Sequence, residues 1–370
     1  MTNELIALGG SAGTRHELSV RRFGAPGARP KVYVQGGLHA DEMPGVLAAH
    51  HLCALLDGAQ VTGDVLGEVI VLPLANPVGL AQRVLGGALG RFSLADGMNY
   101  NRGYPRLWEA AGDALEGRLG ADEAANGELV RAALRDAAAA LPATTPEDHL
   151  RRALLRLAID ADYVLDLHCD GQATMHLYTL TPDADAFMPL ARLLGAEAVL
   201  VADESGDDPF DEACSRTGPE LRRRFPAHPQ PPGCKAVTVE LRGTADVDDA
   251  LAAADATALL GTLRHMGAVA GVLPELPPAR CVPTPLAAAE PLVAPVGGVI
   301  AYLRTHGDRV TAGEVVAVMV DAASGVRTPV PAPCDGLLFS RRATRHAPAG
   351  TRIGKVAGTQ ARRTGLLLSP

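Results

Sequence analysis

The sequence predicts an α/β fold: a mixed, mostly parallel sheet covered by helices, followed by a smaller all-β domain at the C-terminus. Two observations support this prediction. Short apolar runs alternate with helical patterns over most of the chain, and strands separated by helices are typical of a mostly parallel sheet with both faces covered. The last part of the chain instead repeats one strand-rich pattern twice.

The first domain is predicted over residues 1–272. Alternating residues or short apolar runs predict its strands at residues 15–22, 31–35, 68–74, 163–167 and 235–241. Amphipathic periodicity predicts helices at residues 46–56, 150–159 and 247–264. A tract rich in Ala, Leu, Glu and Arg, residues 106–160, is interpreted as a helical insertion whose favoured role is packing.

The C-terminal domain is predicted over residues 290–370, after a proline-rich linker at residues 273–289. Its two halves each contain Ala-Pro-x-x-Gly followed by apolar residues, and together they resemble the barrel-sandwich hybrid of biotinyl and lipoyl carrier domains. Those carriers present a modifiable Lys at the hairpin between the halves. The corresponding residues, 321–330, contain no Lys, so we expect a structural or lid role and no carrier function.

Composition excludes several classes of protein. The chain has 370 residues, with 34 Lys and Arg against 42 Asp and Glu, and a formal net charge of −8. No basic segment is interleaved with aromatic residues, so no nucleic-acid partner is expected. No apolar stretch approaches the roughly 20 residues that a membrane span needs, and the N-terminus lacks the pattern of a secretory signal. We therefore expect a cytoplasmic protein with no membrane partner.

A candidate metal site begins where the predicted strand at residues 31–35 ends. His39 and Glu42 follow a Gly-Gly turn, and Pro44 suits the first turn of the next helix. The carboxyl ends of strands are where open α/β sheets bind ligands, and nitrogen and oxygen donors three residues apart suit Zn²⁺. A helix-entry histidine with a capping acid would produce the same pattern.

The end of a second predicted strand supplies a third candidate metal ligand. His168 closes the apolar run at residues 163–167, and a catalytic zinc needs three protein ligands and one open position. His39, Glu42 and His168 make that set. Asp166 projects from the same strand face as His168, where it could orient the imidazole, although capping of a neighbouring helix is also open.

Glu240 is the predicted general base. It stands in an otherwise apolar strand, where an isolated buried charge costs several kcal/mol, so it should have a partner or a chemical role. A base near the metal would take the proton of the attacking water. The alternative is a structural role, either pairing with Arg242 or capping nearby backbone groups.

Substrate contacts are predicted for Arg91, Asn101 and Arg102. An amide beside a planar guanidinium can bind a carboxylate in a bidentate manner, and Arg91 could stabilise a developing oxyanion. An ordinary surface turn is the alternative for Asn101 and Arg102.

The order H-x-x-E, Asn-Arg, Asp-Leu-His and Val-x-Glu resembles the succinylglutamate desuccinylase/aspartoacylase family, deacylases with a zinc carboxypeptidase-like fold and commonly a C-terminal β domain. The resemblance covers residues 31–260, with a poorly characterised branch associated with arginine/ornithine transport genes as the nearest match. It implies that His39, Glu42 and His168 bind one zinc ion per chain and that Glu240 activates water. It also implies that the residues contacting the acyl-amino-acid substrate are Arg91, Asn101 and Arg102.

Two features depart from the family pattern. Asn99 replaces the acid of the usual Asp-x-Asn-Arg, so a charged partner is missing there. Extra residues separate Arg91 from Asn101, which leaves Arg83 as a rival for the oxyanion role.

The resulting hypothesis is a zinc-dependent hydrolase that removes an acyl group from a small N-acyl amino acid. The alternatives are a zinc carboxypeptidase for small peptides and a metal-bearing binding or transport-accessory protein without turnover. By analogy with such enzymes, a homo-oligomer is favoured.

Overall fold

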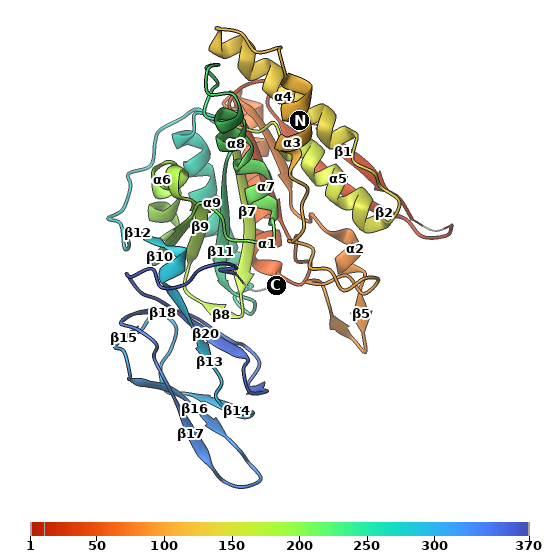
Figure 1. The fold of residues 1–370 in the computed structure, drawn as a ribbon. Helices are drawn as coiled ribbons and strands as arrows, with labels where there is room; N and C mark the ends of the chain where they lie inside the picture. The colour runs from red at the N-terminus through yellow and green to blue at the C-terminus, as the bar shows by residue number, and fades with distance from the viewer. Residues whose placement is uncertain (1, 11, 369–370) are drawn as a thin grey trace.

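The computed structural model describes residues 2–10 and 12–368 and confirms the predicted fold class (Figure 1). A large α/β domain occupies the N-terminal part of the chain, and a smaller β domain, drawn in blue, lies below it. In the described part of the chain, no helix has the length and apolar content needed to cross a membrane.

The large domain is built on a nine-stranded sheet with the order β1-β2-β4-β3-β7-β11-β9-β10-β12. The central strands β4, β3, β7 and β11 are parallel neighbours, whereas β9 runs antiparallel to β11. The strands are β1 (Thr2–Leu8), β2 (His16–Phe23), β3 (Lys31–Gly36), β4 (Glu68–Leu72), β7 (Tyr163–Asp170), β9 (His176–Leu180), β10 (Ala198–Ala202), β11 (Lys235–Gly243) and β12 (Pro283–Pro285).

Helices cover both faces of this sheet because its strands are apolar on both sides. Val32 and Val34 pack on one face, against α1 (Met43–Thr62), α6 (Ala184–Leu194) and α9 (Asp249–His265). Tyr33 points to the other face, which is covered by α3 (Leu107–Leu115), α4 (Glu123–Ala139), α5 (Pro146–Ala158), α7 (Phe210–Ser215) and α8 (Thr217–Arg224). The tract predicted as a helical insertion thus supplies α3, α4 and α5.

Short elements connect the longer helices and strands of these layers. They are α2 (Pro77–Leu80), the hairpin of β5 (Arg83–Val84) and β6 (Gly87–Ala88), and the single-turn 3₁₀ helices η1 (Thr181–Asp183) and η2 (Leu286–Ala288). The β5–β6 hairpin is exposed.

The C-terminal domain consists of two antiparallel sheets around one apolar core. One contains β13 (Ala289–Val293), β20 (Arg352–Ala357), β18 (Gly336–Arg341) and β15 (Arg309–Val310). The other contains β17 (Arg327–Pro331), β16 (Val315–Val320), β14 (Gly298–Tyr302) and β19 (His346–Ala347).

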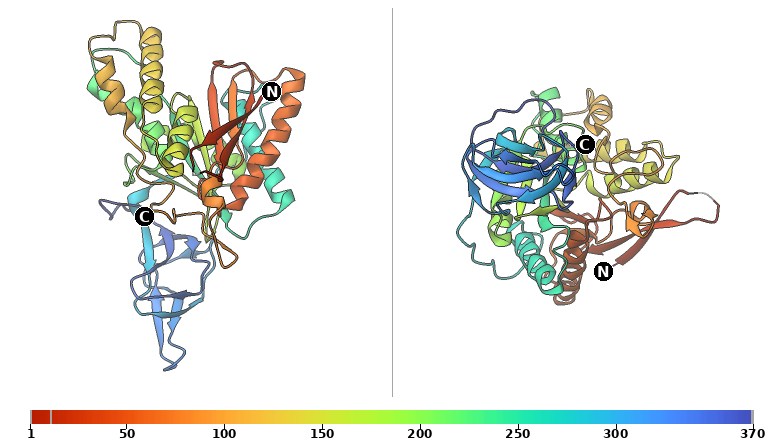
Figure 2. Two further views of the ribbon diagram at one scale, coloured as in Figure 1. Left: turned by 90° about the vertical axis from the view of Figure 1, so that its right-hand side faces the viewer. Right: turned by 90° about the horizontal axis from the view of Figure 1, so that it is seen from below.

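Several contacts tie the C-terminal domain to the large domain, and the left-hand view of Figure 2 shows the β domain directly below it. Strand β8 (Gln172–Ala173), which directly follows β7, pairs with β18. Strand β12, from the stretch predicted as a linker, extends the large sheet beside β10. The chain then returns near its end, where the amide of Leu367 donates to the carbonyl of Ser205 at 2.9 Å. These contacts place the β domain at the carboxyl end of β7.

Candidate metal and catalytic site

The turn after β3 positions His39 and Glu42. Gly37 has a φ of +69°, and a side chain on Gly36 would meet the carbonyl of Gly45 at 2.5 Å, so only glycine lets β3 turn this closely against α1. Glu42 is the residue immediately before α1, whose first turn contains Pro44. The local sequence therefore directs both predicted ligands back over the end of the sheet.

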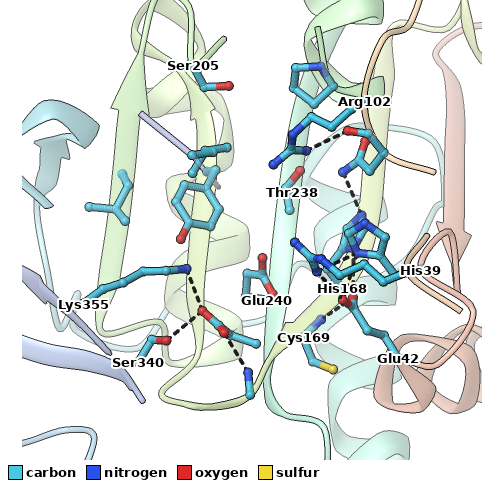
Figure 3. Close-up of a pocket in the computed structure, with 18 of the residues that line it drawn as sticks. His39, Glu42, Arg102, His168, Cys169, Ser205, Thr238, Glu240, Ser340 and Lys355 are labelled. Atoms are coloured by element: carbon cyan, nitrogen blue, oxygen red, sulfur yellow. Dashed lines mark hydrogen bonds and ion pairs between the residues drawn. The ribbon is translucent and has the colours of Figure 1, made fainter. Parts of the chain in front are cut away.

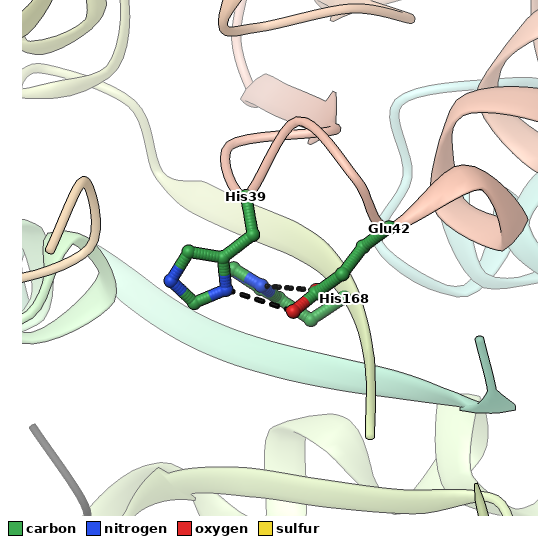
Figure 4. A group of neighbouring side chains, drawn as sticks. All are labelled: His39, Glu42 and His168. Carbon is green, nitrogen blue, oxygen red and sulfur yellow. Dashed lines mark hydrogen bonds and ion pairs between the residues drawn. The ribbon is translucent and has the colours of Figure 1, made fainter. Parts of the chain in front are cut away.

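His39, Glu42 and His168 converge in the structure (Figure 4). One ligand atom from each lies within 4.8 Å of the others, and all three residues are buried. Nδ1 of His39 lies 2.9 Å from Oε1 of Glu42, and Nδ1 of His168 lies 2.9 Å from Oε2. Figure 4 shows both imidazoles turned toward this one carboxylate.

On the side of each imidazole away from Glu42, the Nε2 atom lies close to a polar oxygen. Nε2 of His39 lies 2.8 Å from the amide oxygen of Asn99, and Nε2 of His168 lies 3.0 Å from Oδ2 of Asp166. Gln35 holds Asp166 by donating to its Oδ1 at 2.9 Å. These acceptors favour a proton on each Nε2, so both Nδ1 lone pairs face a carboxylate.

This donor set fits a divalent cation. Two lone pairs and a carboxylate directed at one point repel one another unless a proton or a metal ion lies between them, and the N₂O set suits zinc. Burial opposes the charge on Glu42, yet the neighbouring imidazoles of His39 and His168 hold its pKa well below the usual range. Asn99, where an acid was expected, supplies a neutral acceptor to His39 in place of a charged one.

Glu240 lies beside the cluster, because β11 pairs with β7 in a register that sets Glu240 opposite His168. Its Oε2 is buried and has no hydrogen-bond partner among the described residues. Burial, reinforced by the charge of Glu42, raises the pKa of Glu240 to about 8. The alternative pairing with Arg242 is not found, since Arg242 has a φ of +66° and pairs with Asp255 of α9.

The predicted substrate residues also reach this site. Nη1 of Arg91 lies 3.2 Å from Nδ1 of His39 and 3.3 Å from Oε1 of Glu42. Nδ2 of Asn101 lies 3.4 Å from Nε2 of His168, and the buried Arg102 donates to the carbonyl of Asn101 at 2.7 Å. The rival Arg83 lies in the exposed β5–β6 hairpin and does not line the cavity described next.

Residues of both domains line one cavity of about 830 Å³. Its lining includes His39, Glu42, His168, Glu240, Arg91, Asn101 and Arg102, but not Asp166 or Asn99. Figure 3 shows Lys355 and Ser340 of the C-terminal domain on the opposite side of Glu240 from His39 and Glu42. Lys355 Nζ lies 2.7 Å from Oδ2 of Asp170, and the hydroxyl of Ser340 donates to the same oxygen at 2.7 Å.

Sequence reasoning missed several residues of the cavity wall. Asp211 and Glu212 of α7, Ser205 before it and Lys355 of β20 all line the cavity. The concentration of acids at residues 203–212 was a signal for the first two. Lys355 had none, because only the tertiary fold brings β20 to the end of β7.

Comparison with known proteins identifies a matching family and similar solved structures that cover most of the chain. The profile of the succinylglutamate desuccinylase/aspartoacylase catalytic domain matches residues 28–266. The structure of a succinylglutamate desuccinylase/aspartoacylase family protein from Shewanella amazonensis SB2B superposes with a TM-score of 0.82 at 26% identity, covering 96% of this chain and 98% of that one. A similarly described protein from Shewanella frigidimarina NCIMB 400 gives 0.82 at 25% identity, with 96% of each chain covered.

A more distant structure shares the fold alone. The product-bound ectoine utilization protein EutE (DoeB) from Ruegeria pomeroyi gives a TM-score of 0.67 at 18% identity, covering 96% of this chain and 94% of that one. No curated protein matches the sequence. None of these comparisons tests the placement near transport genes, which stays a prediction.

Proposed function

The chain belongs to the succinylglutamate desuccinylase/aspartoacylase family of deacylases, and from this premise we propose that it removes the acyl group from an N-acyl amino acid with the help of zinc. The observation that carries the proposal is the convergence of His39, Glu42 and His168 beside the unpartnered carboxylate of Glu240. The family accounts for deacylation, whereas the metal and the substrate class are inferred from this site.

His39, Glu42 and His168 would hold one zinc ion, through Nδ1 of each imidazole and the carboxylate between them. When bound there, zinc supplies a Lewis acid that polarises the acyl carbonyl and makes water more acidic. Asp166 and Asn99 would keep both imidazoles in the orientation that binding requires, since each accepts a hydrogen bond from Nε2.

Glu240 would move the proton. As a base it takes a proton from the attacking water, and as an acid it then delivers that proton to the nitrogen of the leaving amine. A pKa raised by burial suits this double role, because the carboxyl group both accepts and releases a proton readily near neutral pH. Arg91 is placed to stabilise the oxyanion, and Asn101 with Arg102 to bind the carboxylate of the amino acid.

A metal assay combined with a substrate panel tests the proposal. We expect purified protein to bind about one zinc ion per chain, given its three-ligand site, and to hydrolyse N-acetyl or N-succinyl amino acids. Chelation should abolish hydrolysis, and added zinc should restore it. Turnover of blocked dipeptides alone would instead indicate a carboxypeptidase. Tight binding of intact N-acyl amino acids without turnover would indicate a binding protein.

A further inference from the structure

Glu212 is a buried carboxylate in the cavity wall that the deacylation does not use. The residue is 6% exposed and lines the cavity from α7. Its Oε1 accepts a hydrogen bond from the amide of Ser205 at 2.7 Å. Its Oε2 is buried and has no hydrogen-bond partner within residues 2–10 and 12–368. Since a buried acceptor without a donor is costly, this oxygen is suited to a donor that a ligand brings.

The nearest cation does not satisfy Glu212. Nη1 of Arg216 lies 4.0 Å from its Oε2, beyond hydrogen-bond distance. The same guanidinium is engaged by outer carboxylates, with Glu204 at 2.9 Å and Glu220 at 3.2 Å. Because Arg216 is shared among three carboxylates, its positive charge does not neutralise Glu212 at the cavity wall. Burial and the adjacent Asp211 accordingly raise the pKa of Glu212 to about 7.

Asp211 and Arg102 complete this end of the cavity. Asp211 is 8% exposed and accepts a hydrogen bond from the hydroxyl of Thr238 at 2.9 Å. Figure 3 shows Arg102, Thr238 and Ser205 above Glu240 in this view, whereas Cys169 lies below it. Burial lowers the pKa of Arg102, and the nearby charges of Asp211 and Glu212 oppose this lowering only in part. A ligand with one cationic and one anionic group could therefore pair the first with the acidic side chains and the second with Arg102.

We propose that Glu212 binds a positively charged group of the substrate, so that the preferred substrates are N-acyl derivatives of basic amino acids. This rests on the proposed deacylase function and names its substrate class. The carboxylate of such an amino acid would bind Arg102, and the ammonium or guanidinium of its side chain would donate to Oε2 of Glu212. A cavity of about 830 Å³ has room for both groups together with the acyl chain.

Binding of the product amino acids tests this directly. Zinc-loaded protein would be titrated calorimetrically with L-lysine and with L-norleucine, which lacks only the side-chain ammonium. Each titration would be repeated with Glu212→Gln. Glu204→Gln is the matched control, because Glu204 contacts the same Arg216 but is half exposed and does not line the cavity. Hydrolysis of Nα-acetyl-lysine and N-acetyl-norleucine would be measured in parallel.

We expect lysine to bind about tenfold or more tightly than norleucine, as for a charge-assisted hydrogen bond. Glu212→Gln should bring the two affinities within about twofold, since it removes that bond's charge, while Glu204→Gln retains the preference. Equal binding of the two ligands by the parent protein, no binding of either, or a preference that survives Glu212→Gln, would overturn the proposal. The hydrolysis assay distinguishes failure of this proposal from failure of the proposed function. Turnover without preference for the basic substrate refutes only the role of Glu212, whereas selective binding without turnover refutes only the deacylase function.

Discussion

Replacing Glu240 by Gln should slow catalysis strongly and stabilise the metal-free protein at alkaline pH. The substitution keeps the shape of the side chain and removes its proton transfer, which typically costs about 10²-fold or more in turnover. Zinc content should stay unchanged, because Glu240 is not among the three converging ligands. The same substitution also removes a buried charge that lacks a hydrogen-bond partner on one oxygen.

The size and sign of the stability effect follow from the pKa of Glu240. Raising this pKa from 4.5 to about 8 costs several kcal/mol of folding free energy at high pH, at about 1.4 kcal/mol per tenfold change in proton affinity. Partial exposure of the side chain reduces this to ~1–3 kcal/mol. The cost is absent below pH 4.5, where both states are protonated, grows as the unfolded state ionises, and is complete once the pH exceeds 8.

Urea denaturation of chelator-treated protein at pH 5 and pH 9 measures this difference. Chelation is needed because a nearby cation would lower the pKa of Glu240. Glu240→Gln should gain stability over the parent mainly at pH 9, whereas Glu275→Gln, at an exposed position between the domains, should gain nothing. A variant that hydrolysed substrate at the parent rate would refute the catalytic assignment. An equal effect at both pH values would refute the electrostatic reasoning.

Three further substitutions test the metal site. His39→Ala should lose stoichiometric zinc and activity, while His51→Ala, a partly exposed histidine paired with Asp249, should keep both as measured by metal analysis. Asp166→Asn should weaken zinc binding about 10–100-fold, the usual cost of losing an outer hydrogen-bond partner, and an unchanged affinity in a chelator competition would contradict the orienting role. Asn99→Asp should tighten zinc binding in the same competition, because a carboxylate on Nε2 of His39 makes Nδ1 more basic.

Much of the site was predictable because its determinants are local. The Gly-Gly turn, the H-x-x-E spacing and the apolar run that precedes His168 each fix the direction of a side chain within a few residues. Parallel strands then bring those ends together at one edge of the sheet. This reasoning predicted that His168 would converge with His39 and Glu42, more than a hundred positions earlier in the chain, and the structure brings the three side chains together.

The remaining parts depend on tertiary contacts without a periodic signal. Glu212 becomes a candidate binding residue only when the fold buries its Oε2 and leaves that oxygen without a hydrogen-bond donor. The pairing of β8 with β18 joins segments far apart in the sequence, and β12 forms from a proline-rich stretch that composition assigned to a linker. The proline at each end of β12 is tolerated because this strand is at the edge of the sheet.

The sequence allowed either a structural role or a lid role for the C-terminal domain. Its contacts favour the structural role, with the domain forming a fixed wall of the cavity. Asp170 stands two residues after His168 on β7 and binds both Lys355 and Ser340. The next residues form β8, which pairs with β18 of the same domain. Opening the domain as a lid would break this ion pair and this strand pairing at once, and would leave Asp170 without either partner. The β domain therefore both lines the cavity and stabilises the strand that carries His168.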